Sequence, residues 1–447
     1  MPHQTIYALS TVYGKSGVAV VRVSGENALD SIRKMTHLSA ETLRPREAYF
    51  CPLFDIKSRE MLDKVLVIYF NTPHSFTGED TVEIHCHGSK AVLGSVLENL
   101  SRIEGFRLAE PGEFSKRAFY NKKMDLTEAE GLADLIDAET SAQQKQALRQ
   151  MSGGLRKLYD NWREQLLKVY AYLEAYIDFP EEDIDPKIMK ECEETVEKLV
   201  CEIENHLNAS KNGERLREGF RVVLAGPTNA GKSSLLNAIV ARKAAIVSDV
   251  AGTTRDALDV HLDVGGYPVI LTDTAGLRQS DDTIEKQGIE IARQKAEDAD
   301  LILGVFDGAL SSKNVFEEMP EALKNKMIFV AEKADILSEK QKEDLEKQGC
   351  IVVSAKTKEG LEKLFEQIKT HIHQTVSSGS SEIITRVRYR EALKECVANL
   401  KAFGFDKPIE LSGEDIRLAA RALGKITGQI EVGEILDKIF GSFCIGK

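Results

Sequence analysis

Apolar runs of strand length alternate with helix-like segments through the middle of this chain. Strands are predicted over Phe220 to Ala225, Val269 to Thr272, Leu301 to Phe306, Met327 to Ala331 and Cys350 to Val353. The segments between them have helical spacing, as in Ser234 to Ile239. Runs that are apolar throughout indicate strands buried on both faces, so we expect a parallel sheet with helices on both sides. Ligands bind such sheets at the carboxyl ends of the strands.

The region before these strands has two different patterns. Residues 1–120 are predicted as an α+β domain, whereas residues 121–215 are predicted as almost wholly helical because their apolar residues recur at helical spacing. In the α+β part we expect strands over Val18 to Val23, Val65 to Phe70 and Thr81 to His85 and a helix over Ser89 to Arg102. In the helical part, Thr127 and Glu130 have the spacing of a capping box.

The C-terminal region is predicted to be helical again. The Ser- and Gly-rich segment Val376 to Ser381 is typical of a linker, and Ser412 and Asp415 are suited to a helix start. The predicted fold class is α/β and α. The expected domains are residues 1–120, a helical domain built from residues 121–215 and 376–447, and an α/β domain over residues 216–375 that is inserted into it.

Composition narrows the classes of protein to consider. The 447 residues carry a net charge of −12, and no apolar run approaches the length of a membrane span. The N-terminus lacks a secretion signal, and the seven cysteines form no C-x-x-C pair, as expected for reduced cytosolic thiols. We therefore expect a cytoplasmic protein without a membrane anchor, in which a nucleic-acid partner would be met by a local basic patch.

A phosphate-binding motif lies between the first of these strands and the following helix. Gly226 to Ser233 fits the pattern G-x-x-x-x-G-K-[ST] in the strand–loop–helix context that the motif requires. Inward-pointing N–H groups and the helix N-terminus hold a polyphosphate there. Lys232 is expected to reach the β and γ phosphates, and Ser233 to bind Mg²⁺.

Further motifs follow in the order that a GTPase requires, each after a predicted strand or in a switch loop. The expected GTP-binding residues are Asn229, Ala230, Gly231, Lys232, Ser233, Ser234, Thr253, Thr254, Asp273, Thr274, Ala275, Gly276, Lys333, Asp335, Ser354, Ala355 and Lys356. Asp335 indicates guanine rather than adenine, because a carboxylate accepts hydrogen bonds from the N1–H and the amino group of guanine. Ser354 to Lys356 resembles the loop that supports the base from its other side.

One residue departs from the usual N-K-x-D motif, because Glu332 stands where Asn is expected. A carboxylate cannot donate to guanine N7 and cannot replace the cross-links of the amide to the phosphate loop. We therefore expect weaker binding of GDP and GTP, by roughly 5- to 150-fold if about 1–3 kcal/mol is lost. In the alternative, Glu332 turns into solvent and a water replaces the amide.

Four segments outside the middle of the chain carry a resemblance over its whole length. They are Ser75 to Asp80, Pro111 to Ser115 with Arg117 to Phe119, Asp134 to Ala138 and Phe443 to Lys447. With them the chain resembles the MnmE (TrmE) family of bacterial tRNA-modification GTPases. It departs from that family at Val12 to Gly14, where the family usually has a Pro-Pro-Gly turn.

The resemblance implies an N-terminal folate-binding domain, a helical domain and an inserted Ras-like P-loop GTPase domain. It implies a homodimer that works with the flavoprotein MnmG, as a heterotetramer, on tRNA. The two proteins would install an aminomethyl or carboxymethylaminomethyl group at C5 of the wobble uridine. A tetrahydrofolate derivative such as 5-formyltetrahydrofolate would supply the one-carbon unit.

The resemblance also implies site residues in the N-terminal region and at the C-terminus. The expected folate-binding residues are Arg22, Glu83, Lys123 and Lys447, with the thiol of Cys444 near the folate. Arg and Lys suit the glutamate tail of a folate, and Glu suits the pterin edge. Cys444 is four residues from the end, as in a prenylation box, but Gly446 and Lys447 fit that motif poorly. His85 and His87 are expected on one face of a strand and Cys86 on the other, which favours a structural role over metal binding.

For hydrolysis, the resemblance implies K⁺ in place of an arginine finger. Leu277 occupies the position where many GTPases have a water-orienting Gln. The implied ligands are Asn229, Ser248, Val250 and Thr253 for K⁺ and Ser233 and Thr254 for Mg²⁺, with Glu285 as the catalytic carboxylate that activates water. Glu285 taken alone is also compatible with a plain surface charge.

Two other functions stay open at this point. One is a ribosome-assembly or regulatory GTPase switch without modification chemistry, although no KH-like RNA module is evident. The other is a scaffold that uses GTP turnover for timing. Analysis of the wobble uridine in a strain without the gene distinguishes tRNA modification from both.

Overall fold

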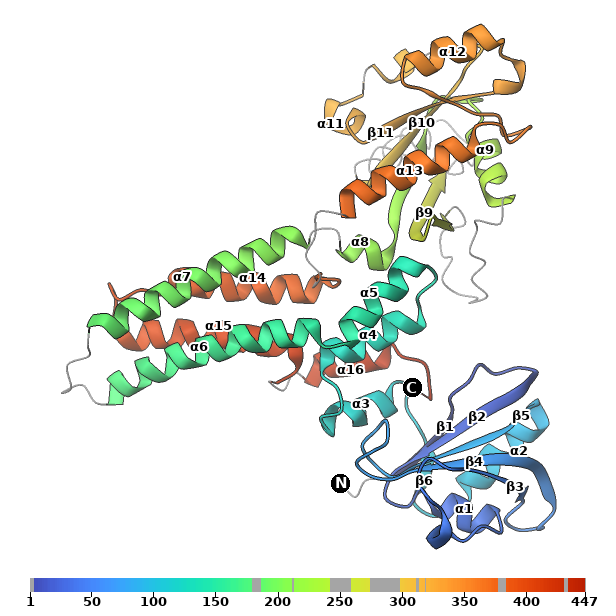
Figure 1. Cartoon of the computed structure of the whole chain (residues 1–447), viewed down its shortest axis with the longest axis vertical. Coiled ribbons are helices and arrows are strands. Elements are labelled where there is room, and N and C mark those ends of the chain that lie inside the picture. Colours follow the sequence, from blue (N-terminus) through green and yellow to red (C-terminus); the bar gives the residue numbers. More distant parts are fainter. Residues whose placement is uncertain are drawn as a thin grey trace, which may run out of the picture. The chain divides into compact units, whose positions relative to one another are not determined.

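The computed structural model describes residues 4–178, 186–210, 213–241, 259–273, 298–310, 313–317, 319–376, 383–429 and 433–446 (Figure 1). The chain forms two compact units. The first consists of Met1–Ala133, Arg156–Glu164 and Arg421–Lys447, and the second of Asp134–Leu155 and Gln165–Ala420. Each unit contains one six-stranded sheet. The predicted linker after Val376 and the switch-loop residues lie outside the described residues.

The sheet of the first unit has the strand order β3-β4-β5-β2-β1-β6. Its strands are β1 (Thr5–Leu9), β2 (Ser16–Ser24), β3 (Ala48–Phe54), β4 (Met61–Phe70), β5 (Thr81–Gly88) and β6 (Phe106–Leu108). Neighbours are antiparallel except β1 and β6. The three predicted strands are confirmed within a few residues of their expected bounds.

Two helices cover one face of this sheet, α1 (Asp30–Met35) and α2 (Lys90–Ser101). Ile32 of α1 and Leu93 of α2 are in one buried core with Val21 and Val67 of the strands. The helix predicted after Ser89 is confirmed, and Ser89 caps it by accepting a hydrogen bond from the Val92 N–H. The other face of the sheet is covered in one part and exposed in another, since Phe114 packs against Ile6 and Ala8 of β1 whereas Phe50 and Leu66 are 70% and 42% exposed.

Further helices of the first unit come from two parts of the chain, directly after the sheet and near the C-terminus. They are α3 (Glu113–Tyr120), the first part of α4 (Leu126–Ile136) and α16 (Gly433–Gly441), preceded by a short 3-10 turn, η1 (Ala40–Thr42). The capping box predicted at Thr127 is wrong by two residues. Asp125 accepts from the Glu128 N–H at 2.7 Å, and Glu128 accepts from the Asp125 N–H at 2.8 Å, because the helix begins earlier than its apolar pattern suggests.

The second unit has the remaining helices of the predicted helical domain. They are α5 (Ser141–Met151), most of α6 (Gly154–Asp178), α7 (Pro186–Ala209), α8 (Gly213–Glu218), α14 (Val387–Ala402) and most of α15 (Ile409–Thr427). The helix start predicted at Ser412 is wrong. The helix begins at Ile409, because Pro408 favours helical backbone and its carbonyl accepts from the N–H groups of Leu411 and Ser412.

The sheet of the second unit has the order β12-β11-β10-β7-β9-β8. Its strands are β7 (Phe220–Ala225), β8 (Asp259–Val264), β9 (Tyr267–Asp273), β10 (Leu301–Asp307), β11 (Met327–Glu332) and β12 (Ile351–Val352). The five predicted strands are confirmed and are parallel. The expectation of a purely parallel sheet is wrong at one edge, where β8 pairs antiparallel with β9.

Helices cover both faces of this sheet, as predicted (Figure 1). On one face lie α9 (Lys232–Ile239) and α13 (Leu361–Val376), and on the other lie α11 (Glu321–Lys324) and α12 (Glu339–Lys347). Two short turns, η4 (Lys313–Phe316) and η5 (Ala334–Ile336), connect them. Among the described residues, no helix has both the length and the apolar character needed to span a membrane.

Candidate functional site

The phosphate loop connects the end of β7 to the first turn of α9. Gly226 has a φ of +150°, and a Cβ at this position would lie 2.0 Å from the Val305 carbonyl oxygen. Asn229 and Gly231 also have positive φ values, 63° and 96°. Glycine is required at Gly226, where a side chain would clash with backbone, and the resulting turn leads into the N-terminus of α9, which can bind an anion.

Two side chains of this loop have the positions that the sequence predicts. The buried Lys232 donates through Nζ to the carbonyls of Gly226 and Pro227, both at 2.7 Å, so its charge lies over the loop. Ser233 donates through Oγ to Asp273 Oδ2 at 2.8 Å, although 40 residues separate them. This hydroxyl and carboxylate form an all-oxygen set, which is the chemistry that Mg²⁺ prefers.

The predicted base-binding residues come together from the ends of β11 and β12. Ser354 donates through Oγ to Asp335 Oδ1 at 2.8 Å, and Lys356 Nζ lies 3.8 Å from Asp335 Oδ2. The hydrogen bond from Ser354 is the main cause that holds the pKa of Asp335 below its usual value, and the positive charge of Lys356 lowers it further. Asp335 is therefore a carboxylate at neutral pH, as guanine recognition requires.

The structure adds one residue that the motifs did not identify, Asp307. It is the last residue of β10, and its Oδ2 accepts from Lys333 Nζ at 2.6 Å. This hydrogen bond raises the pKa of Lys333 and fixes the stem of its side chain beside the base site. The signal in the sequence is its place, because it follows a buried strand at the same sheet edge as the other motifs.

Glu332 is buried rather than turned outward. It is 4% exposed, and its Oε1 accepts from the Ala355 N–H at 2.9 Å. A Cβ built on Gly231 would lie 2.7 Å from its other oxygen, so the carboxyl group packs against the phosphate loop. The alternative in which Glu332 turns into solvent is therefore wrong.

Several predicted site residues cannot be placed. Ser248, Val250, Thr253, Thr254, Thr274, Ala275, Gly276, Glu285 and Lys447 lie outside the described residues. Of the others in the phosphate loop, Ala230 is buried and Ser234 is in the first turn of α9. Their predicted roles stay predictions.

A second candidate site lies in the first unit, on the face of the sheet opposite α1 and α2. Arg22 of β2 and Glu83 of β5 are directly opposite in register, and the Arg22 Nη2 donates to Glu83 Oε1 at 2.9 Å. The guanidinium lies over the rings of Phe76 and Phe114, with centroid distances of 5.4 and 5.8 Å. The two charges form one pair here, and their expected roles in folate binding stay predictions.

The neighbouring strand positions agree with the sequence prediction. His85 Nε2 is 3.2 Å from Glu83 Oε2, and His87 points to the same face and is exposed. Cys86 points into the core, where burial raises the pKa of its thiol to about 11. No group of His, Cys, Asp and Glu among the described residues could hold a metal ion.

The other two described candidates for the folate site are Lys123 and Cys444, which contact the segments that carry Phe76 and Phe114. Lys123 donates through Nζ to the Pro73 carbonyl at 2.9 Å, at the start of the loop that carries Phe76. Cys444 is exposed, and its carbonyl accepts from the Gly112 N–H just before α3. The Gly446 carbonyl accepts from Ser10 Oγ at 3.1 Å, which fixes the C-terminal segment at the end of β1.

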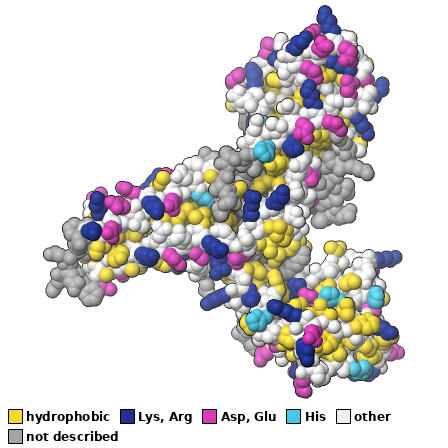
Figure 2. Space-filling model, in the orientation of Figure 1, with side chains coloured by type: hydrophobic (Ala, Val, Ile, Leu, Met, Phe, Trp, Pro, Cys, Tyr) yellow, Lys and Arg dark blue, Asp and Glu magenta, His cyan; other side chains and the backbone are white. Residues whose placement is uncertain are grey.

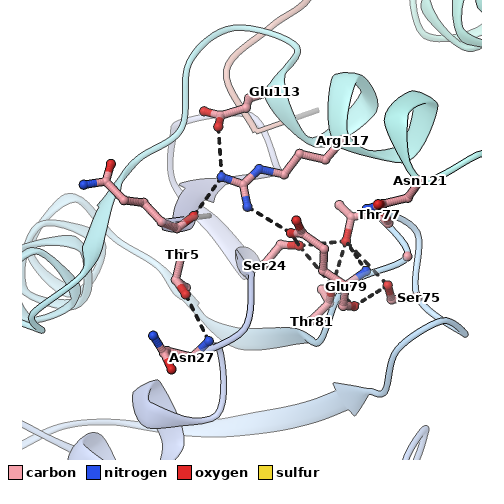
Figure 3. Close-up of polar contacts among 12 residues, drawn as sticks. Thr5, Ser24, Asn27, Ser75, Thr77, Glu79, Thr81, Glu113, Arg117 and Asn121 are labelled. Atoms are coloured by element: carbon pink, nitrogen blue, oxygen red, sulfur yellow. Dashed lines mark hydrogen bonds and ion pairs between the residues drawn. The ribbon is translucent and has the colours of Figure 1, made fainter. Parts of the chain in front are cut away.

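Two of the segments that carried the family resemblance, residues 75–80 and 111–119, contribute to a polar network that we call the Arg117 network (Figure 3). Arg117 of α3 donates to Glu79 Oε2 at 2.9 Å, to Glu113 Oε1 at 3.0 Å and to the Gln4 carbonyl at 2.8 Å. Glu79 also accepts from Ser24 of β2 at 2.9 Å. These contacts attach α3, which carries Phe114, to the strands that carry Arg22 and Glu83.

Comparison with known proteins identifies the family of this chain. The family profile described as the MnmE helical domain matches residues 126–444, and that of the GTP-binding protein TrmE N-terminus matches residues 5–123. The tRNA modification GTPase MnmE of Rickettsia typhi is 44% identical over 446 residues, covering 99% of this chain and 100% of the relative.

A second relative and a solved structure complete the comparison. MnmE of Parvibaculum lavamentivorans is 47% identical over 452 residues, with 99% and 100% of the two chains covered. Among solved structures, the G domain of the T. maritima FeoB iron transporter is 29% identical, covers 34% of this chain and 98% of its own, and has a TM-score of 0.25. With a phosphate loop and a carboxylate for guanine in place, and relatives of the same length, the chain is a GTPase and belongs to the MnmE family of tRNA modification GTPases.

Proposed function

We propose that this GTPase, with a flavoprotein partner of the MnmG type, installs an aminomethyl or carboxymethylaminomethyl group at C5 of the tRNA wobble uridine. A tetrahydrofolate such as 5-formyltetrahydrofolate supplies the one-carbon unit, and the reaction takes place in the cytoplasm. The observation that carries the proposal is the second site, where Arg22 and Glu83 form a paired, aromatic-lined group in a chain that also binds GTP. A GTPase that acts only as a switch has no need of such a site.

The open face of the N-terminal sheet supports a homodimer. Phe50 of β3 pairs with Leu66 of β4, which gives two adjacent exposed apolar residues, and Leu66 pairs in turn with His85 of β5. Phe50 and Leu66 are 70% and 42% exposed, and hydrophobic side chains gather on the surface of this unit in Figure 2. Exposed apolar patches of this kind mark protein interfaces. Glu83 is two residues from His85 and points to the same face, so a folate pocket lies beside the proposed dimer contact.

The described part of the phosphate loop is consistent with both proposed cations. Ser233, with Thr254 from the switch loop, is proposed to bind Mg²⁺, and Asn229 to contribute to K⁺ binding with Ser248, Val250 and Thr253. Asn229 is exposed and has left-handed backbone, a conformation that Asn adopts more readily than most residues. K⁺ would supply positive charge near the phosphates, while Glu285 holds the attacking water.

The first prediction concerns K⁺. We expect GTP turnover to rise by roughly a hundred- to a thousandfold when K⁺ replaces Na⁺ at constant ionic strength, since one positioned group at developing negative charge has effects of about this size. The reason is Leu277, which cannot orient water. The measurement is phosphate release under saturating GTP.

Two variants accompany this measurement. Glu285→Ala should lose turnover in K⁺ and still bind a fluorescent GDP analogue, whereas the neighbouring Asp281→Ala should behave like the parent. Equal rates in the two salts would contradict the K⁺ site, and loss of nucleotide binding in Glu285→Ala would assign that residue a structural role.

The second prediction concerns the folate. Calorimetry should show that 5-formyltetrahydrofolate binds the intact chain and binds Arg22→Ala roughly 10- to 150-fold more weakly, because a hydrogen bond to a charged group contributes about 1.5–3 kcal/mol. The matched control is Arg33→Ala, since Arg33 is an exposed arginine of α1. In a strain without the gene, the parent chain should restore wobble modification by mass spectrometry, while Arg22→Ala should not, although its GTP turnover is intact. A deletion strain with fully modified tRNA would refute the proposed function.

A further inference from the structure

The buried carboxyl group of Glu332 faces two neighbours that need different hydrogen-bonding partners. On one side its Oε1 accepts from the Ala355 N–H at 2.9 Å. On the other side it packs against Gly231, within the loop that holds the phosphates. The Asn of the usual motif provides one acceptor and one donor. An ionised carboxylate provides acceptors only, whereas a protonated carboxylic acid provides one of each.

The charged groups around Glu332 do not supply it with a counter-ion. Lys333 is bound to Asp307 at 2.6 Å, and Lys356 lies 3.8 Å from Asp335. Lys232, on the phosphate loop, donates to two loop carbonyls. Among the described residues no ion pair involving Glu332 is present. Burial and the negative charges of Asp335 and Asp307 therefore both disfavour ionisation of Glu332.

These surroundings favour the neutral form. Burial raises the pKa of Glu332 above its usual value, and the charges of Asp335 and Asp307 add to this effect. The Ala355 hydrogen bond and the charge of Lys333 oppose it without reversing the direction. A bound nucleotide brings further negative charge to the same loop and covers the site, which shifts the balance further toward the protonated acid.

We propose that Glu332 is a nucleotide-positioning residue that acts as a neutral carboxylic acid. One oxygen accepts from Ala355, and the other donates its proton toward the phosphate loop and the acceptor edge of guanine. Protonation thus restores the donor that the chain loses by having Glu in place of Asn. The proposal rests on guanine-nucleotide binding alone and is independent of K⁺, folate and the flavoprotein.

A pH dependence follows from this arrangement. The nucleotide binds the protonated form, so affinity is highest below the pKa of Glu332 in the free protein. Above that pKa each pH unit weakens binding by up to about tenfold, until the pKa of the complex is reached. A residue with only a packing role produces no such dependence.

The test is a titration of a fluorescent GDP analogue into the full chain between about pH 5.5 and about pH 8.5. The comparison is Glu332→Gln, which keeps the length and a permanent donor but cannot ionise. GDP itself titrates in this range, and the ratio of the two Kd values removes that shared effect. We expect a ratio of parent to variant that rises by roughly tenfold or more from the lowest to the highest pH.

Further variants make every outcome decisive. Glu339→Gln, an exposed glutamate of α12, should follow the parent at every pH. Glu332→Asn, which has the residue of the usual motif, should show the same pH profile as Glu332→Gln, so the comparison does not depend on how well the longer Gln side chain packs. A constant ratio across the pH range overturns the proposal, as does the failure of both amide variants to bind GDP at low pH while their circular dichroism is unchanged. An infrared band of a protonated carboxyl group in the GDP complex, absent in Glu332→Gln, would support it.

Discussion

Asp335→Asn is expected to change the base preference of this GTPase from guanine to xanthine. The Asp335 carboxylate is oriented by Ser354 at 2.8 Å and is ionised at neutral pH, since that hydrogen bond lowers its pKa. It can accept from both N–H groups at the edge of guanine. An Asn offers one acceptor and turns an N–H group toward the amino group of guanine. Two hydrogen bonds to a charged group, at about 1.5–3 kcal/mol each, sum to about 3–6 kcal/mol and imply a loss of GDP affinity of roughly 150- to 25,000-fold.

Xanthosine diphosphate provides the opposite test, because it has a carbonyl where guanine has the amino group. The Asn amide can donate to that carbonyl, so the variant should bind the xanthine nucleotide more tightly than GDP. Competition of both nucleotides against a fluorescent GDP analogue for the parent, and a fluorescent xanthine analogue for the variant, measures the change. Asp344→Asn, on the exposed side of α12, is the control. An unchanged preference for GDP in Asp335→Asn would remove Asp335 from the base site.

Asp335 and Glu332 have separable effects although they are three residues apart. Asp335 reads the base and should set the GDP-to-xanthine ratio at every pH. Glu332 acts through protonation and should change the pH profile without changing that ratio. Under this proposal the two residues would have separate roles, with Asp335 selecting the base and Glu332 contacting the phosphate loop.

The central sheet could be predicted from the sequence because its strands are buried on both faces and have no polar alternation. The edge strand β8 could not be predicted in this way, because only one of its faces is buried. His261 and Asp263 alternate with Leu262 and Val264, as expected for a strand with one solvated face, and such a short pattern is hard to distinguish from a loop. The phosphate loop was predictable because its glycines fulfil strict steric requirements.

The side-chain pairings were beyond the reach of sequence reasoning. Arg22 and Glu83 are 61 residues apart, and only the register of β2 and β5 shows that they neutralise each other. The environment of Glu332 depends on the packing of β11 against the phosphate loop and the loop after β12. The sequence shows that this residue departs from its motif, but its burial decides what the departure does.

The Arg117 network leads to the second large prediction, which is that Arg117→Met destabilises the first unit by about 3–5 kcal/mol. Arg117 is 8% exposed and neutralises both Glu79 and Glu113. Burial alone would raise the pKa of Glu113, but the hydrogen bonds from Arg107 and Arg117 hold it below its usual value. Removal of Arg117 leaves the Glu79 carboxylate, whose side chain is 16% exposed, without a cation, and this cost is larger than the worth of the intact pair.

Scanning calorimetry of the full chain measures this effect as a lower melting temperature of the first unit, by roughly 6–20 °C for a unit of this size. Arg33→Met is the control, because its exposed pair with Asp30 contributes little. A second substitution, Glu79→Gln, should restore part of the loss in Arg117→Met, since it removes the stranded charge. The stability from Glu113 is present above its unfolded pKa and is lost as the pH falls, so the gap between parent and variant should narrow in acid.

Folate binding should weaken in Arg117→Met as well, because Arg117 positions α3 even though it does not contact the proposed ligand. The Arg117 network fixes α3, and α3 places Phe114 against the guanidinium of Arg22. The double variant should therefore recover binding in step with its melting temperature. Arg22→Ala should lose more binding than its melting temperature accounts for, because it removes the proposed ligand contact as well as the pair with Glu83. If Arg117→Met melts like the parent yet no longer binds folate, Arg117 contacts the ligand itself, and the network is part of the site rather than its support.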